Sequence, residues 1–77
     1  MSDYQGWKNR ATWNIALWIN NDFQLYSQAL EFVNDYKGKK PYEDFVKVYN
    51  LNTTPDHFSF TDESLDIVEL DSMMEHL

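Results

Sequence analysis

The densest hydrophobic pattern lies near the start of the sequence, where residues 13–19 read WNIALWI. The apolar residues do not alternate with polar ones, which disfavours a half-exposed strand. A fully buried strand could have this composition, but the flanking residues favour a helix, because Asn9 is a suitable N-cap and Asn20-Asn21-Asp22 forms a break. At about 100° per residue the apolar positions cover most of a helix circumference. We therefore predict a helix from Arg10 to Asn20 that is buried on nearly every side.

Three amphipathic segments follow. Asp22 is placed to cap a second helix over residues 23–37, with Gly38 as its C-cap. One half of this helix is apolar, comprising Phe23, Leu25, Tyr26, Ala29, Leu30, Phe32, Val33 and Tyr36. Pro41 suits the first position of a third helix that ends near Leu51, and Glu43 and Asp44 favour its first turn.

A last helix is predicted from Ile67 to about His76. Asp66 and Glu69 have the spacing of a capping box, in which the Asp accepts from the third helical amide and the Glu reaches back. Residues 52–56 have loop composition, and residues 57–60 alternate as a short extended segment would. The prediction is a single mostly α-helical domain over residues 1–77, a bundle of about four helices around the first, with residues 1–8 as a loosely ordered arm anchored by Trp7.

Asn14 is the only polar residue within the apolar run. If it is buried it must be hydrogen-bonded, because an unpaired buried amide costs about 1–3 kcal/mol. It is placed to tie the loop after the third helix to the core. The alternative is that Asn14 or a neighbouring Trp contacts a partner.

Composition narrows the chemistry further. The sequence has no Cys and only two Gly, which removes disulfides, thiolate metal sites and glycine-rich phosphate loops. The spacing of Asp62, Glu63 and Asp66 does not match a calcium loop, and neither His57 nor His76 is accompanied by a placed nucleophile. We expect no catalytic residue, metal or cofactor, and thus a protein that is not an enzyme. With no apolar run of about 20 residues and no signal-peptide pattern, we expect a cytoplasmic protein without membrane contact.

The net charge of −7 is concentrated in the last third of the sequence. Residues 1–50 carry six basic and six acidic groups, whereas residues 51–77 carry seven acidic groups and no Lys or Arg. Such a field repels nucleic acid and attracts basic surfaces. It is either a solvated face that keeps the protein soluble or a partner-binding surface. The candidate surface comprises Asp62, Glu63, Asp66, Glu69, Asp71 and Glu75.

One motif carries a resemblance. The residues Asn9-Arg10-Ala11-Thr12-Trp13-Asn14, then Ala16-Leu17-Trp18-Ile19 and Asn21-Asp22, resemble a family of small uncharacterised proteins of bacteriophages, plasmids and some bacteria. That family is marked by N-x-x-T-W, an A-L-W-[IL] run and N-[DE], and it has no assigned activity. The match covers residues 7–33, about a third of the chain. The resemblance implies an origin in a mobile element.

Three functions remain open. The first is inhibition of a nucleic-acid-binding host defence complex of the CRISPR or restriction type, by protein binding or DNA mimicry, in which carboxylates replace phosphates on a basic surface. The second is an accessory module that binds a protein through an aromatic patch. The third is a structural homo-oligomer. For the first we expect a monomer or weak oligomer that binds the basic surface of its partner and not nucleic acid itself.

Overall fold

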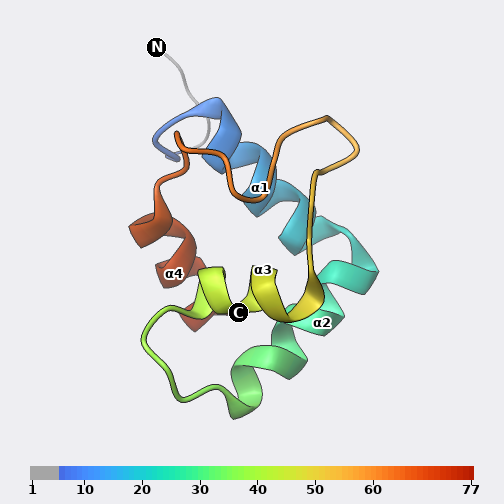
Figure 1. Cartoon of the computed structure of the whole chain (residues 1–77), viewed down its shortest axis with the longest axis vertical. Helices are drawn as coiled ribbons and strands as arrows, with labels where there is room; N and C mark the ends of the chain where they lie inside the picture. The colour runs from blue at the N-terminus through green and yellow to red at the C-terminus, as the bar shows by residue number, and fades with distance from the viewer. Residues whose placement is uncertain (1–5) are drawn as a thin grey trace.

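The structure, a computed structural model, describes residues 6–77 and contains four helices (Figure 1). They are α1 (Arg10–Asn21), α2 (Phe23–Asp35), α3 (Pro41–Tyr49) and α4 (Ile67–Glu75). In the part of the chain that the structure describes, β pairing is limited to one isolated bridge between Thr53 and Ser59. The predicted mostly helical fold is confirmed.

The most extensive helix contacts are α1 with α2 and α3 with α4; α4 also touches α1 and α2, and α2 also touches α3. No Cα atom of α1 lies within 8 Å of one in α3, so the prediction that the other helices surround the first is wrong for α3. A long loop leaves α3, runs beside α1 and returns to α4 (Figure 1). Hydrogen bonds fasten this loop to the start of α1. Asn9 Nδ2 donates to the Ser64 carbonyl at 2.7 Å, and the Asp66 N–H donates to Thr12 Oγ1 at 2.9 Å. The start of α1 and the start of α4 are therefore held together.

The predicted helix starts are confirmed by their caps. Asn9 Oδ1 accepts from the Thr12 N–H at 2.9 Å, and Asp22 Oδ1 accepts from the Leu25 N–H at 3.0 Å. Pro41 is the first residue of α3, where its missing N–H leaves no helical hydrogen bond unmade. Asp66 Oδ1 accepts from the Glu69 N–H at 3.1 Å.

Helix α1 supplies more of the buried residues than any other helix, as its apolar sequence predicts. Its buried side chains are Ala11, Thr12, Asn14, Ile15, Ala16 and Ile19. Trp13, Leu17 and Trp18 are only half-buried, so one side of the helix stays partly accessible. The other helices and the long loop complete the core with Ala29, Tyr42, Phe45, Val46, Phe60, Leu65, Leu70 and Met74.

The end of α2 differs from the prediction. The helix stops at Asp35, and Tyr36 rather than Gly38 is the C-cap, with φ −79° and ψ 133°. Tyr36 leaves the helix because its hydroxyl donates to Asp44 Oδ2 at 2.5 Å and accepts from the Lys40 N–H at 2.8 Å. A Cβ at Gly38 would overlap the Tyr36 ring, so glycine is needed there for space.

Two other boundaries and the predicted capping box also need correction. Helix α3 ends at Tyr49 rather than near Leu51, because Asn50 adopts the left-handed conformation with φ 52°. Helix α4 ends at Glu75. Glu69 does not reach back to Asp66, whose N–H already donates to Thr12, and instead Glu69 Oε1 accepts from the Lys8 N–H at 2.9 Å.

The predicted extended segment at residues 57–60 and the predicted N-terminal arm at residues 1–8 have different outcomes. Residues 57–60 contribute one bridging residue and no strand, with Phe60 buried and Phe58 half-buried. Residues 1–5 of the predicted arm lie outside the described residues, but Trp7 is half-buried against the core, as an anchor would be. Across residues 6–77, no helix combines the length and apolar character needed to cross a membrane.

Candidate functional site

Asn14 ties the long loop to the core, as predicted. It is buried in α1, where its Oδ1 accepts from Thr54 Oγ1 at 2.9 Å and its Nδ2 donates to Asp56 Oδ2 at 2.9 Å. Trp18 Nε1 donates to the same Asp56 oxygen at 3.0 Å. Both ends of the lone amide are thus satisfied inside the molecule, and this network accounts for Asn14 without a partner.

The Asp56 carboxylate belongs to this network although it is exposed. The hydrogen bonds from Asn14 and Trp18 lower its pKa, and the nearby Arg10 and His57 act in the same direction. The next residue, His57, has φ 71°, and its N–H donates to the Thr54 carbonyl at 2.8 Å. The segment from Thr54 to His57 is therefore a turn that presents Asp56 to α1.

Four of the six predicted partner-binding carboxylates have acceptor roles inside the fold. Asp66 caps α4, and Glu69 accepts from the Lys8 N–H. Asp62 Oδ1 accepts from Ser64 N and Oγ at 2.7 and 2.6 Å, which lowers the Asp62 pKa. Asp71 Oδ1 accepts from the Tyr42 N–H at 2.9 Å, at the start of α3. These four carboxylates therefore have a structural role that explains their presence without a partner.

Glu63 and Glu75 differ from these four. Both side chains are exposed, and neither carboxylate accepts a hydrogen bond or joins an ion pair within residues 6–77. They are the two predicted carboxylates that have no hydrogen-bonding role within residues 6–77.

The fold adds two carboxylates, Glu43 and Asp44, which the sequence places only in the first turn of α3. The pKa of Asp71 is raised, first by burial and then by the neighbouring charges of Glu43, Glu75 and Asp44, while the Tyr42 N–H partly offsets these effects. The first turn of α3 and the surface of α4 therefore bring their carboxylates together. We call Glu43, Asp44, Asp62, Glu63, Asp71 and Glu75 the acidic face. No local pattern predicts this cluster, because it depends on how α3 packs on α4.

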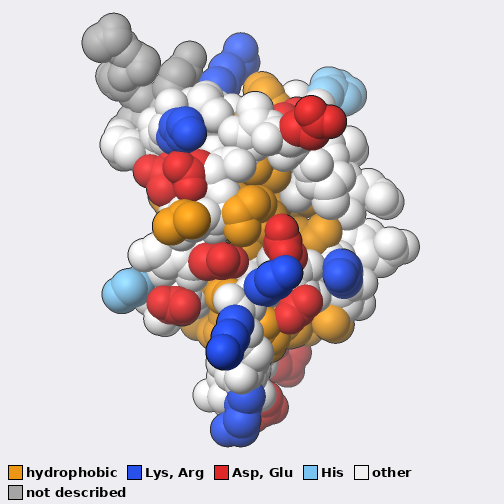
Figure 2. Space-filling view, turned by 60° about the vertical axis from the view of Figure 1, so that its left-hand side comes forward, with side chains coloured by type: hydrophobic (Ala, Val, Ile, Leu, Met, Phe, Trp, Pro, Cys, Tyr) orange, Lys and Arg blue, Asp and Glu red, His pale blue; other side chains and the backbone are white. Residues whose placement is uncertain are grey.

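Basic side chains lie near these helices without neutralising the acidic face. Figure 2 shows Asp and Glu side chains interleaved with Lys and Arg side chains on one side of the molecule. Lys47 lies one turn after Glu43 on α3, yet no ion pair joins them. The acidic face is therefore a local concentration of charge rather than a uniformly negative surface.

Replacement of Asp71 with Asn is expected to stabilise the protein at neutral pH. The side-chain oxygen still accepts from the Tyr42 N–H, whereas the repulsion from Glu43, Asp44 and Glu75 is removed. Because folding raises the Asp71 pKa, its charge opposes folding above that pKa, and the opposition disappears once the pH falls below the ordinary value of 3.8. Thermal melts should therefore give a higher Tm for D71N at pH 7 and no difference near pH 3. The control is Glu31→Gln, which removes one exposed negative charge from α2; an equal gain in that variant would contradict the local repulsion.

A groove of about 440 Å³ lies beside the acidic face, between α3 and the segment that leads into α4. It is lined by Tyr42, Glu43, Val46, Lys47, Phe60, Thr61, Asp62, Glu63, Leu65 and Ile67. Its floor is apolar, since Tyr42, Val46, Phe60 and Leu65 are all buried. The Tyr42 hydroxyl donates to the Phe60 carbonyl at 2.6 Å, and burial raises the Tyr42 pKa. The rim carries three carboxylates and one lysine, so its formal charge is negative.

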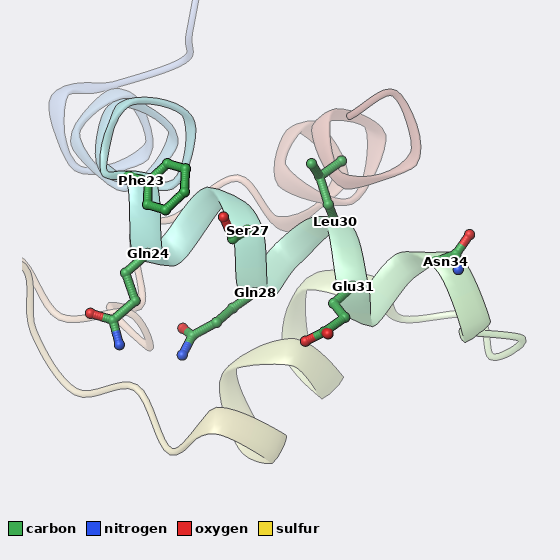
Figure 3. Close-up of a pocket in the computed structure, with 7 residues that line it drawn as sticks. All are labelled: Phe23, Gln24, Ser27, Gln28, Leu30, Glu31 and Asn34. Atoms are coloured by element: carbon green, nitrogen blue, oxygen red, sulfur yellow. The ribbon is translucent and has the colours of Figure 1, made fainter.

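The outer surface of α2 is a second exposed feature, and it corrects a prediction. The sequence predicts Phe23 and Leu30 on the buried half of the helix, but Phe23 is 85% exposed and Leu30 is 37% exposed. Figure 3 shows them along the helix with Gln24, Ser27, Gln28, Glu31 and Asn34. Only Ala29 of α2 is fully buried, and Leu25, Phe32 and Val33 pack at the edge of the core. An exposed Phe beside a Leu is a candidate contact surface.

Within residues 6–77, no three His, Cys, Asp or Glu side chains are arranged to hold a metal ion. His76 Nδ1 lies 2.7 Å from the Ser72 carbonyl, at the end of α4, and His57 is exposed in its turn. The two histidines lie on different elements and have separate surroundings.

Together these features define a small helical domain with an acidic face, an adjoining apolar groove and an exposed helix surface. A model of a family of unknown function, DUF7249, matches residues 1–77, so the chain belongs to that family. No curated protein and no solved structure matches the chain.

Proposed function

We propose that this protein binds another protein through its acidic face and inhibits it. The target is a nucleic-acid-binding complex of a host defence system, of the CRISPR or restriction type, and the inhibitor is carried by a phage or another mobile element. The acidic face occupies a basic surface that otherwise binds nucleic acid phosphates. The protein acts without catalysis, cofactor or metal, in the cytoplasm of a bacterial host.

The observation that carries this proposal is the cluster formed by carboxylates from α3 and α4. Asp71 lies among Glu43, Asp44 and Glu75; burial raises its pKa most, and the charges of these three neighbours raise it further. Like charges held together without an ion pair oppose folding, and groups that are costly for stability are characteristic of functional sites. A basic partner would relieve that repulsion.

Two sequence features support the choice of a basic partner and of a mobile-element origin. The net charge of −7 favours rapid, salt-sensitive association with a basic surface over contact with nucleic acid or an anionic membrane. The resemblance of residues 7–33 to small phage and plasmid proteins favours a mobile-element origin, in which an inhibitor of host defence has a use.

Reversing the charge of Glu63 and Glu75 is expected to abolish capture of the target and its inhibition. Both side chains are exposed and have no partner within the described residues, so Glu63→Lys with Glu75→Lys should change stability by no more than about 1 kcal/mol. The measurement is capture of nucleic-acid-binding complexes from host lysate at low and at high salt. The parent should capture a basic complex at low salt and release it steeply as salt rises.

The matched control is Glu31→Lys with Asp35→Lys, which makes the same charge change on α2. This control should retain most of the capture. If both double variants lose capture equally, the overall net charge attracts the target and the acidic face has no specific role. If neither loses it, the acidic face serves only solubility.

The exposed surface of α2 favours a second candidate, a homo-oligomer. This surface carries a single charged side chain, Glu31, among Phe23, Gln24, Ser27, Gln28, Leu30 and Asn34, so two copies of this acidic protein would meet there with little charge repulsion. Glutamine side chains both donate and accept hydrogen bonds, which suits contact between identical surfaces. Sedimentation velocity over a range of concentrations decides between this candidate and a monomer, and Phe23→Ala should abolish any association.

A further inference from the structure

We propose that the groove between α3 and the segment before α4 binds an arginine side chain of the partner. This inference rests on the proposed function, because it names the anchor that the partner inserts beside the acidic face. The geometry points to arginine through three features: the size of the groove, its apolar floor and its acidic rim.

The size and floor fit a long side chain. The groove volume of about 440 Å³ is within the range of roughly 300–1,000 Å³ typical of ligand sites. Its floor is built from buried Tyr42, Val46, Phe60 and Leu65. The Tyr42 hydroxyl is already bonded to the Phe60 carbonyl, so the floor presents carbon surface rather than a free polar group. Methylene groups of an arginine stem would pack on such a surface while the charged end stays at the rim.

The rim complements a cation. Glu43, Asp62 and Glu63 line the groove together with a single cation, Lys47, which leaves a net charge of −2. Glu43 is half-buried, and no hydrogen bond or ion pair within residues 6–77 engages its carboxylate. Asp62 uses Oδ1 for Ser64 and leaves Oδ2 without a hydrogen bond in the same range.

The placement of these carboxylates on two different elements favours arginine over lysine as the occupant. Glu43 projects from α3, whereas Asp62 and Glu63 belong to the loop across the groove. A guanidinium carries five N–H donors in a planar fork and can engage carboxylates on two sides, whereas an ammonium is a compact and strongly hydrated charge. Arginine is also more weakly hydrated, which reduces the cost of placing it against an apolar floor.

The test uses purified protein and model compounds, so it does not depend on finding the target. Uniformly ¹⁵N-labelled protein is titrated with N-acetyl-arginine methylamide at moderate salt. Saturable amide shifts are expected at residues 43–47 and 60–67, with a dissociation constant on the order of millimolar for so small a ligand. The citrulline analogue has almost the same shape without charge and should bind at least about fivefold more weakly, because it lacks charge-assisted hydrogen bonds.

Substitutions at the groove and on α2 show where on the protein the arginine compound binds. Glu43→Gln with Glu63→Gln should weaken arginine binding at least about fivefold, since both substitutions remove a charge that would pair with the guanidinium. Glu31→Gln with Asp35→Asn removes the same charge from α2 and should leave the affinity unchanged. An unperturbed ¹⁵N spectrum outside the groove shows that each variant is folded.

Several outcomes would overturn the proposal. Equal binding of the citrulline or norleucine analogue would show that the groove recognises only apolar shape. Equal binding of the lysine analogue would show a general cation site without selection for arginine. Shifts spread over all acidic residues, or an equal loss in the α2 variant, would show non-specific charge attraction. Arginine binding in the groove without capture of a host complex would instead contradict the proposed target and leave this site intact.

Discussion

Truncation of Phe45 to alanine is expected to lower the Tm by roughly 15–30 °C, a far larger effect than the loss of an exposed side chain. Phe45 is fully buried in α3, and the centroid of its ring lies 5.6 Å from the centroid of the Phe32 ring and 5.1 Å from that of the Tyr49 ring. Loss of a buried Phe costs about 3–5 kcal/mol, because the cavity left behind closes only partly. A domain of 77 residues has little more stability than that to lose.

The matched control for this substitution is Phe23→Ala, the same chemical change at a side chain that is 85% exposed. Its effect on stability should not exceed about 0.5 kcal/mol, because the exposed ring loses little contact. Thermal melts of both variants at one protein concentration provide the measurement. A Phe45 variant that melts within a few degrees of the parent would mean that α3 does not close the core.

Replacement of Asn14 with Asp is expected to cost about 3–5 kcal/mol, the penalty of a buried charge without a compensating partner. The change is nearly isosteric, but it places a carboxylate where the Asn14 amide now donates to Asp56 Oδ2 at 2.9 Å. Two carboxylates would then face each other, and one would lie in the core. Chemical denaturation at pH 7 measures the loss, which should shrink as the pH falls and the carboxylates become protonated.

Two further variants make this result specific. Asn52→Asp adds the same charge in an exposed part of the long loop and should have little effect on stability. The double exchange Asn14→Asp with Asp56→Asn restores an amide opposite a carboxylate and should recover a large part of the loss. No recovery would indicate that the position of the charge matters and that the pairing with Asp56 does not.

The fold was predictable from the sequence because its signals are local. The spacing of apolar residues, the caps at Asn9, Asp22 and Asp66 and the proline at the first position of α3 each act within a few residues, and all four helix starts are confirmed. Burial of Asn14 was expected from its place in an apolar helix, and its internal hydrogen bonds were expected because a buried amide must find partners. The sequence also predicted that Asn14 contacts the loop after the third helix, and Thr54 and Asp56 of that loop are its hydrogen-bond partners.

The helix ends were less predictable. Glycine is the usual residue at a helix C-terminus, so Gly38 was the expected end of α2. The helix ends earlier, at Asp35, because the Tyr36 hydroxyl donates to Asp44. Glu69 has the spacing of a capping box, but the amide it would reach donates to Thr12. In both cases a contact with a distant segment replaced the local one.

The sequence by itself determined the four helices, the large share of buried residues in α1 and the concentration of acidic residues in the last third of the chain. Only the tertiary structure decided which acidic residues are available to a partner. It assigned Asp66 and Asp71 to backbone hydrogen bonds, brought Glu43 beside Asp71, and exposed Phe23 on α2. The physical reason is that caps and periodicity act between neighbours in the sequence, whereas the acidic face, the groove and the exposed helix surface depend on how whole helices pack against one another.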